Sequence, residues 1–327
     1  MAAEMAEQPA VLARLVARAP QDAEAVGMIV PRPLAGIVLL ARGSSDNAAV
    51  LGRYLTELAA GRPAGLAAPS LYTRYRAQVD WRGYLVVALS QSGATPEIVT
   101  TCRAVRTAGA AVVGITNVAD SELASASDVV LAADAGLEHA IPATKTVTAQ
   151  MLLLITVAQA LGPVDATAEQ LLELPAAVKG ILDDSRPIDL LADRWAQVDR
   201  LVVAGRGLGY AAALECALKV KETTGILAEG ISTADLRHGP IAAVNAGAPV
   251  LLVDAGGPVL RDLADLRRLL TDRHAEMSTL PLGSPLPELL QVLMAVVRGQ
   301  QLARALALVR RVDPDTPATL TKITLTA

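Results

Sequence analysis

The sequence predicts an α/β protein built from two tandem doubly wound domains, each with a parallel β-sheet covered by helices. Three observations lead to this prediction. The chain has 327 residues, which corresponds to about two domains of roughly 150 residues each. Its strand-like segments are continuous apolar runs, as in strands that are buried on both faces. These runs alternate with helix-like segments, which is the order of βα units in a parallel sheet.

The composition favours a large aliphatic core and excludes several classes of protein. Hydrophobic residues make up 52% of the chain and charged residues 19%, so the chain can bury a core and is not expected to be disordered. Its 29 basic and 33 acidic residues give a formal charge of −4, which lacks the basic footprint of a nucleic-acid-binding protein. Aromatic residues are only 2%, with no Phe, which argues against base-stacking surfaces. We therefore expect no nucleic-acid partner.

Cysteine and histidine usage predicts neither a disulfide framework nor a metal site. Cys102 and Cys216 lie far apart and form no CxxC pattern, and the histidines form no cluster. We expect no metal and no other cofactor. The first ten residues carry Glu4 and Glu7 and lack the apolar centre of a signal peptide. The apolar run 151–161 is too short to span a bilayer, so we expect a cytoplasmic protein without a membrane partner.

The first half of the chain is expected to form four strands with two intervening helices. The strands are expected near residues 37–41, 84–89, 111–115 and 128–131, and the helices near 46–60 and 96–108. The segment 146–196 is expected to be helical and to join the two halves. Breaks are expected at Gly162-Pro163 and near Pro187, because Gly-Pro and Pro interrupt helices.

An internal repeat divides the chain into halves. The segments 37–43 and 201–207 are both apolar strands that end in Arg-Gly. Residue 37 thus corresponds to residue 201, and we call this shift in numbering the repeat offset. The same offset relates the apolar segment 85–89 to the apolar segment 249–253. A shared offset indicates a duplicated domain. The predicted domains are residues 1–165 and residues 166–327, and the second includes an extended tail at 313–327.

The strongest candidate for a ligand site is the segment 90–96, which directly follows a buried strand. Pro96 suits the first turn of the next helix, and a helix N-terminus offers unpaired N–H groups and a partial positive charge. The segment adds four polar side chains, Ser90, Gln91, Ser92 and Thr95. Together these groups predict a phosphate cradle without the lysine of a P-loop. The alternative is helix capping, which accounts more readily for one hydroxyl than for three.

A second turn, residues 42–47, also connects a strand to a helix and carries Ser44 and Ser45. In an open α/β sheet such turns line the ligand crevice at the carboxyl ends of the strands. The alternative, that Ser45 is only a helix cap, stays open. A third turn, residues 205–209, has three glycines but fails the GxGxxG spacing, and no suitable acidic residue follows about twenty residues later. NAD binding is therefore not expected.

The segment 211–224 is expected to be an apolar helix with one charged face. Glu215, Lys219 and Glu222 are spaced i, i+4 and i+7 and therefore share that face. The face could be a solvated stripe with a Glu–Lys pair. Because the rest of the helix is strongly apolar, the face could instead point into a cleft, where an acid beside a lysine suits proton transfer.

His238 precedes Gly239-Pro240 and is expected in a turn. A histidine can transfer protons near neutral pH, so structural and catalytic roles are both open for it. Nothing around His139 or His274 indicates a role in chemistry.

Taken together, these motifs resemble the SIS (sugar isomerase) family, and more closely the isomerase half of glucosamine–fructose-6-phosphate aminotransferase. The resemblance covers nearly the whole chain in seven ordered motifs: Glu7-Gln8-Pro9, Ser90-Gln91-Ser92-Gly93, Ala143-Thr144-Lys145, Ala217–Glu222, Ala228-Glu229, His238-Gly239-Pro240, and the tail with Asp313-Pro314-Asp315 and Leu320-Thr321-Lys322. It implies a flavodoxin-like fold for both domains.

Among members of this family, the chain is most similar to the stand-alone SIS-type glucosamine-6-phosphate deaminases. This similarity rests on residues 41–47, on Ala143 where the aminotransferase has Ser, and on Lys221-Glu222-Thr223. Pro142 departs from the small residue usual at its position. We expect the chain to begin at the isomerase region, without a glutaminase domain, and so not to carry out glutamine-dependent synthesis.

The resemblance implies a role for each matching residue. The phosphate and neighbouring hydroxyls would be bound by Ser45, Ser90, Gln91, Ser92 and Thr95, with Ser44 and Ala143 also in the binding group. The expected catalytic residues are His238, which would open the sugar ring, Glu222, which would move a proton between C2 and C1, and Lys219 and Lys322. Whether Lys322 forms an imine is left open.

The expected function is conversion of glucosamine 6-phosphate to fructose 6-phosphate and ammonia. The alternatives are a deglycase of 6-phosphorylated ketose–amine conjugates, a galactosamine-6-phosphate deaminase, and, in a different class, a non-catalytic phosphosugar-binding regulator. At the repeat offset, Ser90 corresponds to Asp254 and Glu222 to Leu58. We therefore expect one composite site per chain, and the resemblance implies that a homodimer completes it.

Overall fold

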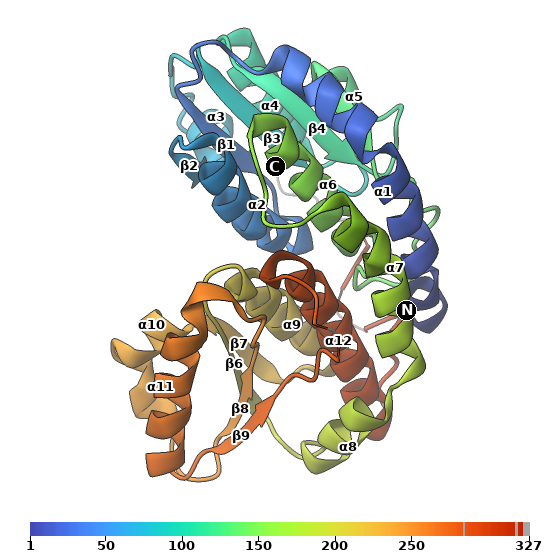
Figure 1. The fold of residues 1–327 in the computed structure, drawn as a ribbon, viewed down its shortest axis with the longest axis vertical. Coiled ribbons are helices and arrows are strands. Elements are labelled where there is room, and N and C mark those ends of the chain that lie inside the picture. The colour runs from blue at the N-terminus through green and yellow to red at the C-terminus, as the bar shows by residue number, and fades with distance from the viewer. Residues whose placement is uncertain (284, 318–319, 323–327) are drawn as a thin grey trace. The chain divides into compact units, whose positions relative to one another are not determined.

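The computed structural model describes residues 1–283, 285–317 and 320–322 (Figure 1). The chain forms two compact units. The N-terminal unit contains residues 10–138, 145–164 and the described residues 321–322, and the C-terminal unit contains residues 1–9, 139–144 and most of the chain from 165 to 320. The units therefore differ from a single division at residue 165, because short segments from each half of the sequence belong to the other unit.

The N-terminal unit has a five-stranded, all-parallel sheet. Its strands are β1 (Gly36–Leu40), β2 (Ala64–Leu66), β3 (Tyr84–Leu89), β4 (Ala111–Thr116) and β5 (Val129–Ala132), in the order β2-β1-β3-β4-β5. This is the flavodoxin-like order, in which the direction of winding changes between β1 and β3. Sequence analysis missed β2 because its three residues, Ala-Gly-Leu, form no apolar run.

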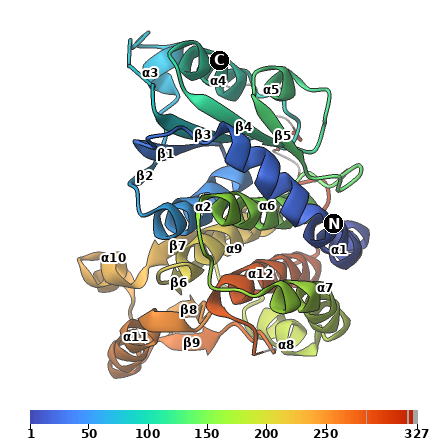
Figure 2. The same cartoon turned by 45° about the horizontal axis from the view of Figure 1, so that its top comes forward.

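Helices cover both faces of this sheet. The helices are α1 (Ala2–Ile29, of which residues 10–29 belong to this unit), α2 (Ser44–Ala60), α3 (Ser70–Thr73), α4 (Pro96–Thr107), α5 (Glu122–Ser125) and α6 (Lys145–Leu161). Figure 2 shows α3, α4 and α5 on one face and α1, α2 and α6 on the other. The core between the sheet and α4 is aliphatic and includes Val86, Ala88, Ile98 and Val99.

The C-terminal unit repeats this plan with one strand fewer. Its strands are β6 (Arg200–Gly205), β7 (Leu227–Ser232), β8 (Pro249–Leu252) and β9 (Glu276–Thr279), all parallel in the order β7-β6-β8-β9. Its helices are α7 (Ala168–Asp183), α8 (Arg186–Arg194), α9 (Gly209–Thr224), α10 (Thr233–Arg237), α11 (Leu260–Asp272) and α12 (Glu288–Val309), with short 3₁₀ turns η1 (Pro240–Ala243) and η2 (Gly257–Val259).

The fold class predicted from the sequence is confirmed. Strands β1 and β6 begin at Gly36 and Arg200, and helices α2 and α9 end at Ala60 and Thr224, so both pairs keep the repeat offset. The strand β5 has no counterpart in the described C-terminal sheet, because the same offset leads into α12. Of the predicted tail, residues 313–317 and 320–322 form neither helix nor strand, and its other residues lie outside the described part of the chain.

Two long apolar helices complete the two units in the same way. Helix α6 packs against α2 in the N-terminal unit, and α12 packs against α9 in the C-terminal unit. Among the described helices, α12 alone is long and apolar enough to cross a membrane by length and composition, and 83% of its most apolar window is buried. Such burial is typical of a helix in a protein core.

Candidate functional site

The turn between β3 and α4 brings together the hydroxyls that the sequence singled out. The buried Ser90 follows β3 directly, and its Oγ lies 3.0 Å from Thr95 Oγ1. Ser92 Oγ accepts a hydrogen bond from the backbone N–H of Ala94 at 3.2 Å. Thr95 is the N-cap residue of α4, but its side chain makes no capping hydrogen bond. The hydroxyls therefore line the turn instead of serving as helix caps, while Gln91 is partly exposed beside them.

Gly93 gives this turn its shape. Its φ is +63°, and a Cβ at this position would lie 2.0 Å from Ser121 Oγ. Its N–H donates to the carbonyl oxygen of Ser90 at 3.2 Å, which closes the turn. Only glycine combines this backbone conformation with this close approach.

The second predicted turn lies next to the first one, since β1 and β3 are neighbouring parallel strands. Helix α2 begins at Ser44, and its N-cap is Gly43, with φ +61° and no side-chain cap. The alternative reading of Ser45 as the cap is therefore wrong; Ser45 lies buried in the first helical turn, and Ser44 beside it is partly buried. The β1–β3 switch point is where open sheets of this order bind ligands, and both turns lie there.

An ion pair joins these two turns. Arg42 Nε donates to Glu97 Oε2 at 3.0 Å, and Glu97 lies in the first turn of α4. Burial raises the pKa of Asp46, on the first turn of α2, and the nearby Arg42 guanidinium opposes this rise. The pair links the two turns within the N-terminal unit.

Glu215, Lys219 and Glu222 share one face of α9, as their spacing predicts, and most of this face is buried. Lys219 Nζ lies 3.6 Å from Glu215 Oε1 and forms an ion pair with Glu222 Oε2. Glu215 and Lys219 are fully buried, whereas 23% of the Glu222 side chain is exposed. One carboxylate thus reaches solvent with a buried ammonium behind it. This arrangement can hold a charged acid–base group in place while a small molecule approaches it.

His238 lies in the C-terminal unit as well, in the predicted turn. It is the C-cap residue of α10, it is exposed, and Gly239 follows with φ +131°. Within the described residues, no hydrogen bond joins its side chain to the α9 cluster.

Sequence analysis missed one buried acid, Glu138. Its carboxylate accepts hydrogen bonds from Thr146 N–H at 3.3 Å and Thr146 Oγ1 at 2.6 Å, and from Lys322 Nζ at 3.3 Å. All three residues belong to the N-terminal unit. Glu138 lies in a segment that forms neither helix nor strand, so no periodic pattern in the sequence could have indicated it. The only signal was its position shortly before the Ala143-Thr144-Lys145 motif.

The predicted binding residue Ala143 lies in a loop, residues 139–144, that belongs to the C-terminal unit. Glu4 accepts hydrogen bonds from His139 N–H and from Ala140 N–H, the latter at 3.1 Å. Burial of Glu4 raises its pKa, but these two N–H groups and the charged N-terminus of Met1, 3.1 Å from Glu4 Oε2, together outweigh the effect and hold the pKa below its usual value. Gln300 Nε2 donates to the carbonyl oxygen of Thr144 at 3.1 Å. The loop backbone is thus fixed from several sides.

The turn of the C-terminal unit that is equivalent to the predicted phosphate cradle begins with a carboxylate, Asp254, where the N-terminal unit has Ser90. Asp254 follows β8 and pairs with Arg267 Nη2 at 2.9 Å. Glu288 accepts a hydrogen bond from the backbone N–H of Leu208, and a Cβ on Gly257 would lie 1.9 Å from its Oε2. A side chain of the protein itself therefore occupies the turn that corresponds to the predicted phosphate cradle.

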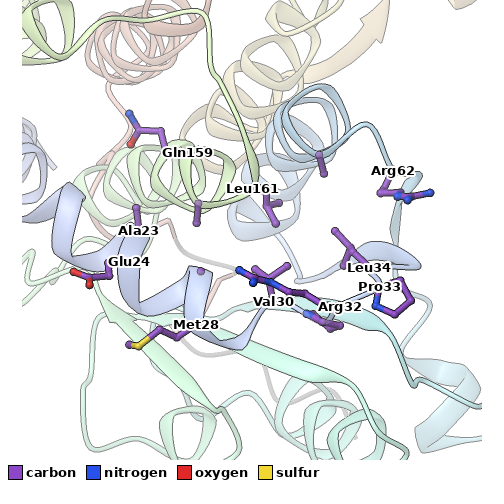
Figure 3. A pocket seen from close by; sticks show the side chains of 14 residues that line it. Ala23, Glu24, Met28, Val30, Arg32, Pro33, Leu34, Arg62, Gln159 and Leu161 are labelled. Atoms are coloured by element: carbon purple, nitrogen blue, oxygen red, sulfur yellow. The ribbon is translucent and has the colours of Figure 1, made fainter.

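A cavity of about 810 Å³ lies elsewhere in the N-terminal unit (Figure 3). It is lined by the end of α1, by residues 30–34, and by the ends of α2 and α6, including Arg32 and Arg62. Residues 30–34 precede β1, so the cavity lies at the amino edge of the sheet, opposite the two polar turns. None of the predicted site residues lines it. In the part of the chain that the structure describes, no three His, Cys, Asp or Glu side chains gather as a metal site.

Comparison with known proteins identifies the relatives of this chain. The family model described as SIS domain matches residues 35–160 and 195–282. The chain is 32% identical over 355 aligned residues to the glutamine–fructose-6-phosphate aminotransferase (isomerizing) of Photorhabdus laumondii. The alignment covers 98% of this chain but 58% of that protein, so the chain spans little more than half the length of this relative.

Two solved structures share the fold along nearly their whole length. The C-terminal domain of glucosamine-fructose-6-phosphate aminotransferase from Francisella tularensis matches with a TM-score of 0.85 and 25% identity, covering 95% of this chain and 96% of that domain. A glucosamine-6-phosphate deaminase from Thermotoga maritima matches with a TM-score of 0.83 and 24% identity, covering 99% of this chain and 98% of that one. At this identity the second likeness concerns the fold alone.

Proposed function

The chain belongs to the SIS domain family, and on that premise we propose that it is an aminosugar-phosphate deaminase. The proposed reaction takes glucosamine 6-phosphate and water to fructose 6-phosphate and ammonia. The observation that carries the proposal is the α9 cluster, in which the partly exposed Glu222 is ion-paired with the buried Lys219. A regulator that only binds a sugar phosphate has no use for such a buried acid–base pair.

The polar turns of the N-terminal unit would bind the phosphate. Ser90, Ser92 and Thr95 offer hydroxyls at the N-terminus of α4, and Gln91, Ser44 and Ser45 add further polar groups at the same edge of the sheet. Backbone N–H groups and the helix dipole favour an anion there. Ala143 would lie against the sugar chain without offering a polar side chain.

The chemistry assigned to the C-terminal unit consists of proton transfers. His238 would move the proton between the ring oxygen and the C1 hydroxyl, which breaks the ring C1–O5 bond and gives the aldehyde. Glu222 would then remove the proton from C2 and return it to C1, through an enolamine, which leaves an imine at C2 and a hydroxyl at C1. Water adds to C2, ammonia leaves, and the ketone of fructose 6-phosphate forms. Lys219 and Lys322 would stabilise charge that develops on oxygen during these steps.

The test is ammonia release from glucosamine 6-phosphate by the purified protein without glutamine, with fructose 6-phosphate assayed in parallel. We expect the two products in equal amounts. If no ammonia is released although the sugar phosphate raises the melting temperature, the deaminase proposal fails. Ketose–amine 6-phosphates and galactosamine 6-phosphate are then the next substrates to test, and a non-catalytic regulator follows only if these too are not turned over.

We also propose that the active form is a homodimer that completes one site per chain. The exposed position of His238, without a hydrogen bond to the α9 cluster within the described residues, supports this proposal. Light scattering of the active protein should give twice the mass of the chain. A stable monomer with full activity would disprove this part of the proposal.

A further inference from the structure

Glu138 is a buried carboxylate whose neighbours come from two distant parts of the sequence. None of its side-chain surface is exposed. Its Oε1 faces Thr146 N–H at 3.3 Å, and its Oε2 faces both Thr146 Oγ1 at 2.6 Å and Lys322 Nζ at 3.3 Å. Lys322 lies near the other end of the chain, and 27% of its side chain is exposed.

The contacts with Thr146 fix the carboxylate in place. Thr146 is the second residue of α6, so its N–H is one of the donors that have no partner within the helix. Glu138 supplies that partner, and the positive end of the helix dipole favours its negative charge. The carboxylate is therefore held by a rigid helix before any contact with the tail is considered.

The contact with Lys322 then restricts the motion of an otherwise flexible side chain. A lysine side chain has four rotatable bonds and loses rotamer freedom when its ammonium is held. A charge-assisted hydrogen bond to a buried carboxylate is among the stronger contacts that could hold it. The described residues 320–322 form neither helix nor strand, so no hydrogen-bonded helix or ladder of their own positions this lysine.

We propose that Glu138 is the positioning residue for Lys322, holding its ammonium in place so that it can act on the sugar phosphate. This inference rests on the proposed function, which assigns Lys322 to the site. A purely structural role, as a cap of α6, predicts different behaviour: loss of the Glu138 charge would then lower stability and leave the contribution of Lys322 to catalysis unchanged.

The test is a double-mutant cycle with Glu138→Gln and Lys322→Met. Glutamine keeps an oxygen for the Thr146 N–H but removes the charge that faces Lys322. We expect Glu138→Gln to lower kcat for ammonia release at least tenfold while KM changes less than threefold. The double variant should be no more than twofold slower than Lys322→Met alone, because residues that act as a unit give non-additive losses.

Asp128→Asn is the matched control. In the same unit, Asp128 likewise accepts a hydrogen bond from a backbone N–H, that of Val112 at 2.8 Å, and from a cationic side chain, that of Arg106 at 2.8 Å. It has no part in the proposed site, so its substitution should leave kcat within twofold. If Glu138→Gln fails to fold, Glu138→Asp keeps the charge at a shorter reach and should give an intermediate loss of kcat.

Two results would overturn the inference: full activity of Glu138→Gln alongside an impaired Lys322→Met, or fully additive losses in the double variant. If the wild-type protein releases no ammonia, the proposed function fails, but the positioning role can still be measured by acetic anhydride labelling. Lys322 should then be labelled at least threefold faster in Glu138→Gln than in the wild type or Asp128→Asn. Equal labelling rates in the three proteins would disprove the contact.

Discussion

The two units of the molecule follow the same path but carry different side chains at matching positions. In each, Arg-Gly follows the first strand of the repeat, and the arginine pairs with an acid on a later helix: Arg42 with Glu97 in one and Arg206 with Asp262 in the other. Beyond this shared frame, the turn after β3 carries hydroxyls, whereas the turn after β8 carries Asp254 and contacts Glu288. The backbone plan was duplicated, and the chemistry of each copy was set by a few side chains.

The central helix pair shows the same principle in packing. In the N-terminal unit Gly52 of α2 lies against Leu154 of α6, and a Cβ on Gly52 would come within 2.8 Å of that side chain. The equivalent residue of α9, at the repeat offset, is Cys216, which faces Gly299 of α12, where a Cβ would lie 2.9 Å from Cys216 Cβ. The glycine lies on α2 in the N-terminal pair and on α12 in the C-terminal pair, so one helix of each pair carries the small residue that close packing requires.

The largest expected effect concerns Glu222, which lies in the C-terminal unit and has no acidic counterpart at the matching position of the N-terminal unit. Glu222→Gln should lower kcat by about 10²–10⁴-fold, because it removes the group that moves the C2 proton. Binding of the sugar phosphate, measured by calorimetry, should change little. Leu58→Gln places the same side chain at the matching position of α2, which is 74% exposed, and should leave kcat unchanged. Turnover that survives Glu222→Gln would show that another residue is the base.

The next effect tests the difference between the two turns directly. Ser90→Asp transfers the acid of the C-terminal copy into the cradle and should weaken binding of the sugar phosphate by about 100-fold or more, since like charges repel in a partly buried site. Asp254→Ser is the reverse exchange and should leave affinity within a few-fold. Calorimetric titration with fructose 6-phosphate measures both, and the melting temperature of each variant shows whether it is folded. Unchanged affinity of Ser90→Asp would exclude this turn as the phosphate site.

The glycines between the paired helices should differ in their tolerance of a methyl group. Gly299→Ala should destabilise by roughly 1–3 kcal/mol, because its new Cβ meets the Cα and Cβ of Cys216. Gly52→Ala should cost less, because the atoms it meets are the ends of leucine side chains that can rotate. Gly180→Ala, where a Cβ meets no atom within 4 Å, should stabilise by about 0.5–1 kcal/mol through helix propensity. Urea unfolding of the three variants measures their free energies of unfolding and so tests this order of stabilities.

The smallest expected effect is a pH dependence at Glu288. Burial raises its pKa above 4.5, and the charge of Asp165 adds to the rise, while the hydrogen bond from Leu208 N–H opposes it. A carboxyl group with a higher pKa in the folded state binds protons more strongly there, so stability falls as pH rises through that window. Relative to Glu288→Gln, the wild type should therefore lose stability from about pH 4.5 upward. Unfolding curves at several pH values measure the difference, and a constant difference would contradict the assignment.

The thiols offer a check on the cores of both units. Burial raises the pKa of Cys102 to about 11 and, with the nearby Glu215, the pKa of Cys216 to about 12. Because the thiolate is the reactive form, neither cysteine of the folded protein should react with a thiol reagent at neutral pH. Both should react after unfolding in urea. Rapid labelling of Cys216 in the native protein would show that the α9–α12 contact opens readily.

The sequence by itself determined the repeating units and the local chemistry. Apolar runs mark the long strands, the repeat offset marks the duplication, and the spacing of Glu215, Lys219 and Glu222 places them on one helical face. These features were predictable because the periods of strands and helices act over a few residues. The turn after β3 was predictable for the same reason, since its hydroxyls all fall within the short segment 90–95.

Only the tertiary structure decided which distant groups meet. It paired Glu138 with Lys322 and brought Glu288 against Gly257. It also placed the three-residue β2 beside β1 although no apolar run marks it, and it showed that Gly43 is the residue that caps α2. Such contacts depend on how loops close over long stretches of chain and on which side chain fills each space. The periodicity of a short segment predicts neither of these, because the free energy of packing depends on which residues are neighbours in space, and these are often far apart in sequence.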